Sequence, residues 1–243
     1  MTISDAILQE LHTLADPEKA KFLQKFFKTG KGEYAENDVF LGIKVPDVRK
    51  VVKRHQTSAT DDIQTLLDSE YHEARLAGLL ALCACFEAAE TEEKRKDIVN
   101  FYLANTAKIN NWDLVDISCR TIIGGYLWDK KDRSLLYRLA DSGNLWEERI
   151  AVVSTWMLIK HGKYEDTLRL AEKFFTHKHD LIHKAVGWML REAGKKDKTT
   201  LTNFLDAHAA QLPRTALRYA IEIFPETERK QYLNIKPVQR TRK

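Results

Sequence analysis

The sequence predicts an all-α protein, and three of its features support this prediction. Of the 243 residues, 44% are hydrophobic, which is enough to bury a large core. There are only ten glycines and five prolines, so long uninterrupted elements are expected. Between these breaks, apolar residues recur every three or four positions rather than alternating, as they do on one face of an α-helix.

Start signals place the predicted helices along the chain. Asp16-Pro17 is typical of a helix cap followed by a first turn, and it opens a helix that reaches about Lys28. Residues 29–44 form the longest irregular segment, of the kind that is usually functional or a linker, and the next helix starts at Val45 and ends near His55. Further helices are expected at about 60–68, 71–88, 91–107, 112–126, 131–141, 144–161, 164–176, 180–193, 197–209 and 213–224.

Helices of this length joined by short turns are expected to stack as antiparallel pairs. A series of such pairs gives a curved solenoid with a concave face, which fits this chain better than a closed bundle does. The sequence contains no strict repeat, so the repeats are predicted to be of the degenerate HEAT-like kind. We expect one repeat domain over residues 1–230 and a basic C-terminal tail over residues 231–243.

The composition argues against membrane proteins and exported proteins. No stretch approaches the roughly eighteen uninterrupted apolar residues of a membrane span, and residues 1–10 lack an export signal. The three cysteines, Cys83, Cys85 and Cys119, are odd in number and lie in apolar helical patterns, as buried thiols do in a reducing compartment. A soluble, cytoplasmic protein is therefore expected.

Positive charge is concentrated toward the C-terminus. Residues 181–243 carry thirteen Lys or Arg against six Asp or Glu, a net charge of +7, whereas residues 1–180 carry 26 against 29, a net charge of −3. A polyanion would be attracted to such a segment, because each neutralised phosphate releases counterions. Basic tails also occur in proteins that bind no polyanion, so charge alone leaves both interpretations open.

An aromatic ring and a carboxylate are predicted to share one helix face in the motif NNWDLVD, residues 110–116. An asparagine can cap this helix, and Asp113 lies near the positive end of its dipole. Trp112 and Asp116 are four positions apart, so they project from the same side. The positions that can turn toward the core are Leu114, Val115 and Ile117. A packed tryptophan beside a first-turn acid is the alternative.

Arg149 interrupts an otherwise core-like helix, LWEERIAVV, one turn after Trp146. A buried or half-buried guanidinium needs a carboxylate or a phosphate, so a salt bridge to a neighbouring helix and an anion site are both open. Two acids, Glu147 and Glu148, precede it. If they face a bound polyanion, they weaken phosphate binding.

The helix at 180–193 carries cations beside an aromatic ring. Lys184, Trp188 and Arg191 share one side of it, and Gly187 thins the helix next to the tryptophan. An exposed tryptophan flanked by cations suits a nucleic-acid backbone, whereas a core tryptophan with solvated cations is the ordinary alternative. Arg214 and Arg218 lie on one face of the next basic helix, whose first N–H groups can add to anion binding.

Metal and nucleotide enzymes are less favoured. His177, His179 and His183 have no nearby carboxylate or thiolate that would complete a convincing metal site. No Ser/His/Asp or Cys/His arrangement, Walker loop or dinucleotide fingerprint is found.

Taken together, five segments resemble the DNA alkylation repair family, typified by AlkD-like alkylpurine DNA glycosylases. They include NNWDLVD, LWEERIAVVS and LPRTALRYAIE, and they occur in the family's order and spacing over about residues 5–225. The segments are 26–50, 110–116, 145–154, 181–197 and 212–222.

This resemblance implies a right-handed superhelix of HEAT-like helix pairs with duplex DNA in a basic concave groove. It implies hydrolysis of the N-glycosidic bond of N3- and N7-alkylated purines in base excision repair, without a metal or an organic cofactor. The lesion would be read from the backbone side, without a snug pocket for the base. A monomer without an obligate protein partner, associated with the nucleoid, is expected.

The motifs assign roles to individual residues. Trp112 and Asp116 match the family's sugar-contacting tryptophan and catalytic carboxylate, and Trp188 matches its second aromatic wall. Arg149 matches its phosphate-binding arginine. The other cations expected to contact DNA are Lys184, Arg191, Arg214 and Arg218.

Three functions remain open at this point. The first is an alkylpurine glycosylase, and the second is a non-catalytic binder of damaged or branched DNA from the same family. The third is a helical scaffold for protein partners, which predicts an apolar concave face and places Trp112 and Trp188 in the core.

Overall fold

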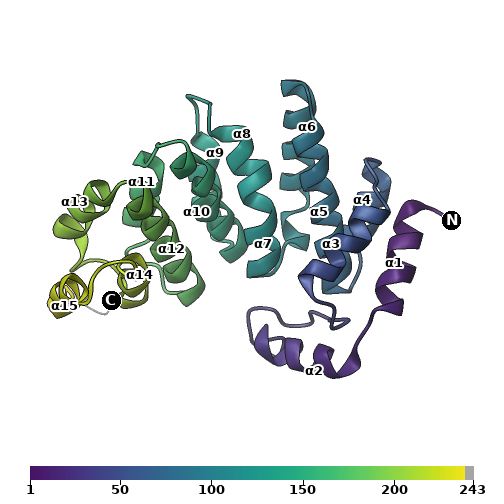
Figure 1. Cartoon of the computed structure of the whole chain (residues 1–243), viewed down its shortest axis with the longest axis horizontal. Coiled ribbons are helices and arrows are strands. Elements are labelled where there is room, and N and C mark those ends of the chain that lie inside the picture. Colours follow the sequence, from purple (N-terminus) through teal and green to yellow (C-terminus); the bar gives the residue numbers. More distant parts are fainter. Residues whose placement is uncertain (239–243) are drawn as a thin grey trace. The chain divides into compact units, whose positions relative to one another are not determined.

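The computed structural model describes residues 1–238, and every regular element in this range is helical (Figure 1). The predicted all-α class is confirmed. The nearest approach to a sheet among these residues is an isolated bridge between Val39 and Tyr71. None of the described helices is long and apolar enough to cross a membrane. The chain divides into two compact units, one over residues 1–122 and one from residue 123 onward.

The first unit is built around α5. Its helices are α1 (Ile3–Thr13), α2 (Pro17–Phe26), α3 (Val45–Arg54), α4 (Thr60–Leu67), α5 (His72–Ala88), α6 (Glu92–Ala104) and α7 (Trp112–Cys119), with a 3-10 turn at Thr106–Lys108. α5 packs against α1, α3, α4, α6 and α7. It is buried along most of its length, which explains why its sequence is apolar on all sides.

Helix α2 and the irregular segment after it form a separate layer of this unit (Figure 1). Asp16 caps α2 and Pro17 occupies its first turn, as predicted, but no residue of α2 is buried. The segment then returns to the start of α5, where the Glu73 carboxylate accepts the N–H groups of Leu41, Gly42 and Ile43 at 2.8, 2.8 and 3.0 Å. Gly42 has a φ of +87°, which a residue with a side chain rarely adopts.

The second unit is organised by two long helices, α10 and α12. Its elements are α8 (Gly125–Leu127), α9 (Ser134–Ala140), α10 (Leu145–Lys160), α11 (Glu165–Lys173), α12 (Asp180–Lys196), α13 (Lys198–His208), α14 (Arg214–Ala220) and α15 (Glu226–Asn234). α10 packs on α9, α11 and α12, and α12 packs in turn on α11, α13 and α14.

Two departures from the predicted elements have physical causes. The helix expected at 112–126 is interrupted by a π-helical segment, η2 (Arg120–Gly124), which periodicity does not reveal. Helix α15 was not predicted and extends into the expected tail at 231–243. It is anchored by Tyr232, which is buried and donates its hydroxyl to Asp206 at 2.7 Å. The rest of that tail, residues 239–243, lies outside the described residues.

Close contact between α12 and α14 depends on Gly187. A Cβ atom at this position would lie 2.4 Å from the backbone oxygen of Ala216 and 2.5 Å from the Cβ atom of Tyr219. Backbone atoms cannot yield as a flexible side chain does. The glycine that thins the helix beside Trp188 therefore sets the separation of two helices.

We expect Gly187→Ala to lower the free energy of unfolding by about 2 kcal/mol, because the overpacking penalty exceeds the gain in helix propensity. Chemical denaturation of both proteins measures the difference. Lys196→Ala, at an exposed position of the same helix, is the control and should change stability by less than about 0.5 kcal/mol. An alanine at 187 that stabilises the protein would contradict this account.

Candidate nucleic-acid interface

Three candidate site residues follow one another at intervals of four, Trp112 and Asp116 on α7 and Arg120 at the start of the π-helical segment. Asn111 caps the helix, its side-chain oxygen accepting the N–H of Trp112 at 2.8 Å. Trp112, Asp116 and Arg120 are all half-buried, whereas Leu114 and Val115 are fully buried on the opposite side. Ile117 is half-buried and lines a pocket, so it is not the core residue that was expected.

Arg120 was missed by the sequence analysis, although its spacing of four from Asp116 was a signal. Its Nε atom donates to the backbone oxygen of Asp116 at 2.9 Å. It is the first residue of the π-helical segment, and such segments occur frequently at functional sites. The chain thus places a guanidinium one turn beyond the candidate catalytic carboxylate.

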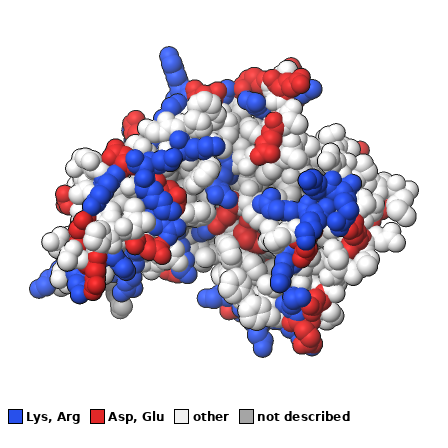
Figure 2. Space-filling view, in the orientation of Figure 1, with Lys and Arg blue, Asp and Glu red and all other residues white. Residues whose placement is uncertain are grey.

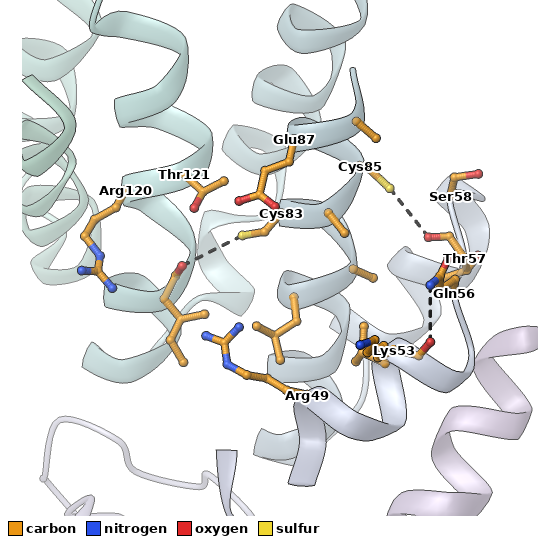
Figure 3. Close-up of a pocket in the computed structure, with 16 residues that line it drawn as sticks. Arg49, Lys53, Gln56, Thr57, Ser58, Cys83, Cys85, Glu87, Arg120 and Thr121 are labelled. Atoms are coloured by element: carbon orange, nitrogen blue, oxygen red, sulfur yellow. Dashed lines mark hydrogen bonds between the residues drawn. The ribbon is translucent and has the colours of Figure 1, made fainter. Parts of the chain in front are cut away.

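A pocket of about 760 Å³ opens between α3, α5 and α7 (Figure 3). Figure 3 shows Arg49 and Arg120 on two of its walls, with Cys83 and Glu87 of α5 on a third. Burial, together with the charge of Glu87, raises the pKa of the Cys83 thiol to about 12, so this thiol is neutral at physiological pH. All three cysteines are free. The pocket therefore presents guanidinium groups and the carboxylate of Glu87 rather than a reactive thiolate.

A dense basic patch covers α3 in the first unit (Figure 2). Arg49, Lys50, Lys53 and Arg54 are all exposed on this ten-residue helix. Lys50 pairs with Asp47 at 2.8 Å, and Arg54 pairs with Glu10. The charge count over residues 1–180 concealed this patch, because acidic residues elsewhere in that range outweigh it.

Trp112 is held by aromatic packing on one side. Its ring stacks on Phe27, with centroids 5.1 Å apart and planes inclined by 19°, and Phe26 approaches it edge-on at 6.2 Å. Phe27 stacks in turn on Phe40 at 4.9 Å. The ring is therefore oriented by the irregular segment and α2, and it does not lie in the core as a scaffold would require.

A buried charge network fixes the first turn of α7. His72, at the start of α5, contacts Asp38 through Nδ1 at 2.9 Å and Asp113 through Nε2 at 2.8 Å. Arg75 pairs with the other oxygen of Asp38, and the Asn111 amide donates to Asp38 at 3.3 Å. The network ties together the irregular segment, α5 and the cap of α7.

The histidine of this network is charged. Burial would lower the pKa of His72, but the charges and hydrogen bonds of Asp113 and Asp38 raise it to about 9. Burial would likewise raise the pKa of Asp38, yet His72 and Arg75 hold it below its ordinary value. A buried imidazolium between two carboxylates follows.

Because the pKa of His72 rises from 6.5 to about 9 on folding, its contribution to stability is complete below pH 6.5 and is lost as the pH rises through 9. The wild-type protein should be more stable than His72→Gln at pH 6.5. We expect this difference in the free energy of unfolding to become smaller by on the order of 3 kcal/mol as the pH is raised from 6.5 to above 9. Urea unfolding at intervals of one pH unit measures it.

The control for this experiment is His12→Gln, which removes an exposed histidine of the same unit. It lacks the contacts with Asp38 and Asp113, so it should not reproduce the loss of about 3 kcal/mol that is expected for His72. A difference for His72→Gln that is constant from pH 6 to pH 9 would show that folding does not raise the pKa of the imidazole.

The second unit carries the other predicted residues on α10, α12 and α14. Arg149 is buried and donates to the backbone oxygen of Leu181 at 2.6 Å, so it holds the start of α12. Glu148 is buried as well and pairs with His177 at 2.9 Å. Glu147 is half-buried. One of the two acids beside Arg149 is thus engaged by a histidine.

The predicted cations of this unit differ in their surroundings. Lys184 pairs with Asp180 at 2.9 Å, and Arg191 pairs with Glu222. Arg214 donates to the backbone oxygen of Leu233 at 2.6 Å, which anchors the end of α15. Arg218 is exposed, and Trp188 is half-buried on α12.

The histidines near α12 are engaged in hydrogen bonds. Besides the pairing of His177 with Glu148, His183 contacts the backbone oxygen of His177 through Nε2 at 2.6 Å. Within residues 1–238, no group of three or more His, Cys, Asp or Glu side chains could hold a metal ion.

Comparison with known proteins relates the chain to a family. A family model described as DNA alkylation repair enzyme matches residues 7–224. A solved structure described as a predicted DNA alkylation repair enzyme from Enterococcus faecalis is similar, with a TM-score of 0.67 and 17% identity over 87% of this chain and 97% of that one.

A second solved structure belongs to a group described as related to the HEAT-like repeat DNA glycosylases, with affinity for branched DNA structures. It has a TM-score of 0.60 and 12% identity over 97% of this chain and 98% of that one. At these identities the two structures establish a shared fold. No curated protein matches the sequence significantly.

Proposed function

Because this chain belongs to the DNA alkylation repair enzyme family, we propose that it is a DNA glycosylase acting on N3- and N7-alkylated purines in duplex DNA. The observation that carries the proposal is that α7 presents Trp112 and Asp116 next to a basic pocket, which Arg120 lines one turn further on. The proposal includes action as a cytoplasmic monomer at the nucleoid.

The chemistry of the substrate suits a carboxylate without a partner acid. An alkylated purine is already cationic and leaves readily, so the positive charge of the transition state develops on the deoxyribose. The Asp116 carboxylate stabilises this charge and orients the attacking water, and the indole of Trp112 packs on the sugar. Phe27 behind the indole holds its plane in place.

Phosphate contacts are assigned first to the basic residues of the pocket. Arg49 and Lys53 on α3 and Arg120 after α7 supply cations on the walls of one pocket. In the second unit, Trp188 and Arg218 are the residues that best fit a DNA contact, since both retain exposed surface. Arg149 supports the proposal least, because its guanidinium is buried against α12.

We expect the protein to release 7-methylguanine and 3-methyladenine from methylated duplex DNA, and Asp116→Asn to slow this release about 100-fold or more by removing the charge that stabilises the sugar cation. Chromatography of the released bases measures both. Asp61→Asn, at an exposed position of α4, should retain wild-type activity. Equal release by Asp116→Asn, or none by the wild-type protein, would rule the proposal out.

A non-catalytic role in binding damaged or branched DNA is the second candidate. It is favoured by the structural relative described as having affinity for branched DNA. The excision experiment separates the two candidates, since a binder retains DNA affinity but releases no base.

Both candidates require that the basic pocket bind phosphate. We expect Arg49→Gln/Lys53→Gln to weaken duplex binding and to reduce the dependence of log Kd on log salt by about 1.8, because each lost phosphate contact removes about 0.9 from that slope. Fluorescence anisotropy across a salt series measures it. Lys94→Gln, on the exposed side of α6, is the matched control. An unchanged slope would place the DNA elsewhere.

A further inference from the structure

A second pocket, of about 470 Å³, is almost entirely apolar. It lies between α2, the end of the irregular segment and the start of α5, all within the first unit. Its main walls are Phe22, Phe26, Phe27, Phe40, Ile43 and Leu76. The volume is within the roughly 300–1,000 Å³ of ordinary small-ligand sites.

The outer wall of this apolar pocket is unusually exposed. Phe22 and Phe26 keep 66% and 55% of their surface open to solvent, more than any other Phe, Tyr or Trp in the described residues. They are one helical turn apart on α2, with centroids separated by 6.3 Å and planes inclined by 15°. Two nearly parallel rings thus stand at the mouth of the pocket, a geometry that suits a flat aromatic ligand.

The charges around the pocket select the kind of ligand. Its acidic groups are already engaged, Glu73 with three backbone N–H groups and Asp113 with His72. The exposed charged groups that line the pocket are Lys19 and Lys44. Lys19 pairs with Asp16 only at the surface, where such a pair contributes little stability. The site is therefore aromatic inside and cationic at its mouth.

We propose that this pocket binds a nucleobase that is unstacked from DNA, with its ring against Phe22 and Phe26. The phosphate attached to that nucleotide lies near Lys19 and Lys44. Aromatic rings combined with cations are the usual means of holding a single-stranded base. The inference rests on the proposed function in that the protein must bind DNA, but it does not require catalysis.

The pocket adjoins the candidate catalytic face, from which Phe26 and Phe27 separate it. Phe27 lines the pocket and stacks on Trp112, and Phe26 lines it and meets the edge of the same indole. A base held there is thus joined to the strand that passes Trp112. The proposal differs from the expectation, drawn from the family resemblance, that there is no snug site for a base.

The test compares two DNA duplexes of equal length, one fully paired and one with a single bulged adenine. We expect the wild-type protein to bind the bulged duplex more tightly. Phe22→Leu/Phe26→Leu should lose about tenfold of that preference, because leucine keeps apolar surface but offers no ring for stacking. Because Phe26 also contacts the edge of the Trp112 ring, the quantity compared is the ratio of the two affinities, and Phe22→Trp/Phe26→Trp should retain that ratio.

Both phenylalanines are exposed, so these variants should fold, which circular dichroism checks. Leu14→Ala, an exposed apolar position outside the pocket, is the matched control. A wild-type protein without a bulge preference, or a double leucine variant that retains it, would overturn the proposal. Absence of base excision with the bulge preference intact would overturn the glycosylase proposal alone.

Discussion

The buried contact of His72 with Asp38 and Asp113 is the interaction on which the rest of the candidate site depends. It joins three parts of the first unit that are distant in sequence: the irregular segment, the start of α5 and the first turn of α7. Each carboxylate would be costly to bury alone, and the imidazolium between them neutralises much of that cost. The neighbouring residue, Glu73, adds a second attachment of the same segment to α5.

These attachments determine how the candidate catalytic face is presented. The cap of α7 is hydrogen-bonded into the network through Asn111, and Trp112 follows directly. The same irregular segment supplies Phe40 and, at its start, Phe27, whose ring orients the indole. Polar and aromatic contacts therefore act on the same turn of helix. Asp116 lies one turn further along α7, so its position is set by the contacts that hold the first turn.

The fold could be predicted from the sequence more fully than the site. Helical periodicity and the residues that start and end helices located almost every helix, because those signals are local. The spacing of Trp112 and Asp116 likewise predicted that the two side chains share one face of a helix. The π-helical segment was not, because it preserves the apolar pattern while changing the hydrogen bonding. Helix α15 was not predicted, and its residues from 231 onward were placed in the tail, because it is strongly polar and its single buried anchor, Tyr232, gives no periodic signal.

The site depends on long-range contacts that spacing does not encode. Asp38 and His72 are 34 positions apart, and His72 and Asp113 are 41 apart, so no motif joins them. The resemblance assigned Arg149 to a phosphate, whereas its guanidinium holds a backbone carbonyl of α12. The basic patch on α3 does not show in the net charge of residues 1–180, because acidic residues elsewhere in that range outweigh it. Local clustering on one helix is the signal that could have revealed it.

The exposed position of α2 has a consequence for local stability. None of its residues is buried, and the backbone contact of Asp16 with Leu41 and the packing of Phe27 fasten it at its two ends. A helix with so little apolar burial opens at a lower free energy than a central helix such as α5, so its amides should exchange with solvent hydrogen sooner. The outer wall of the apolar pocket is therefore expected to open locally while the core of the unit stays folded.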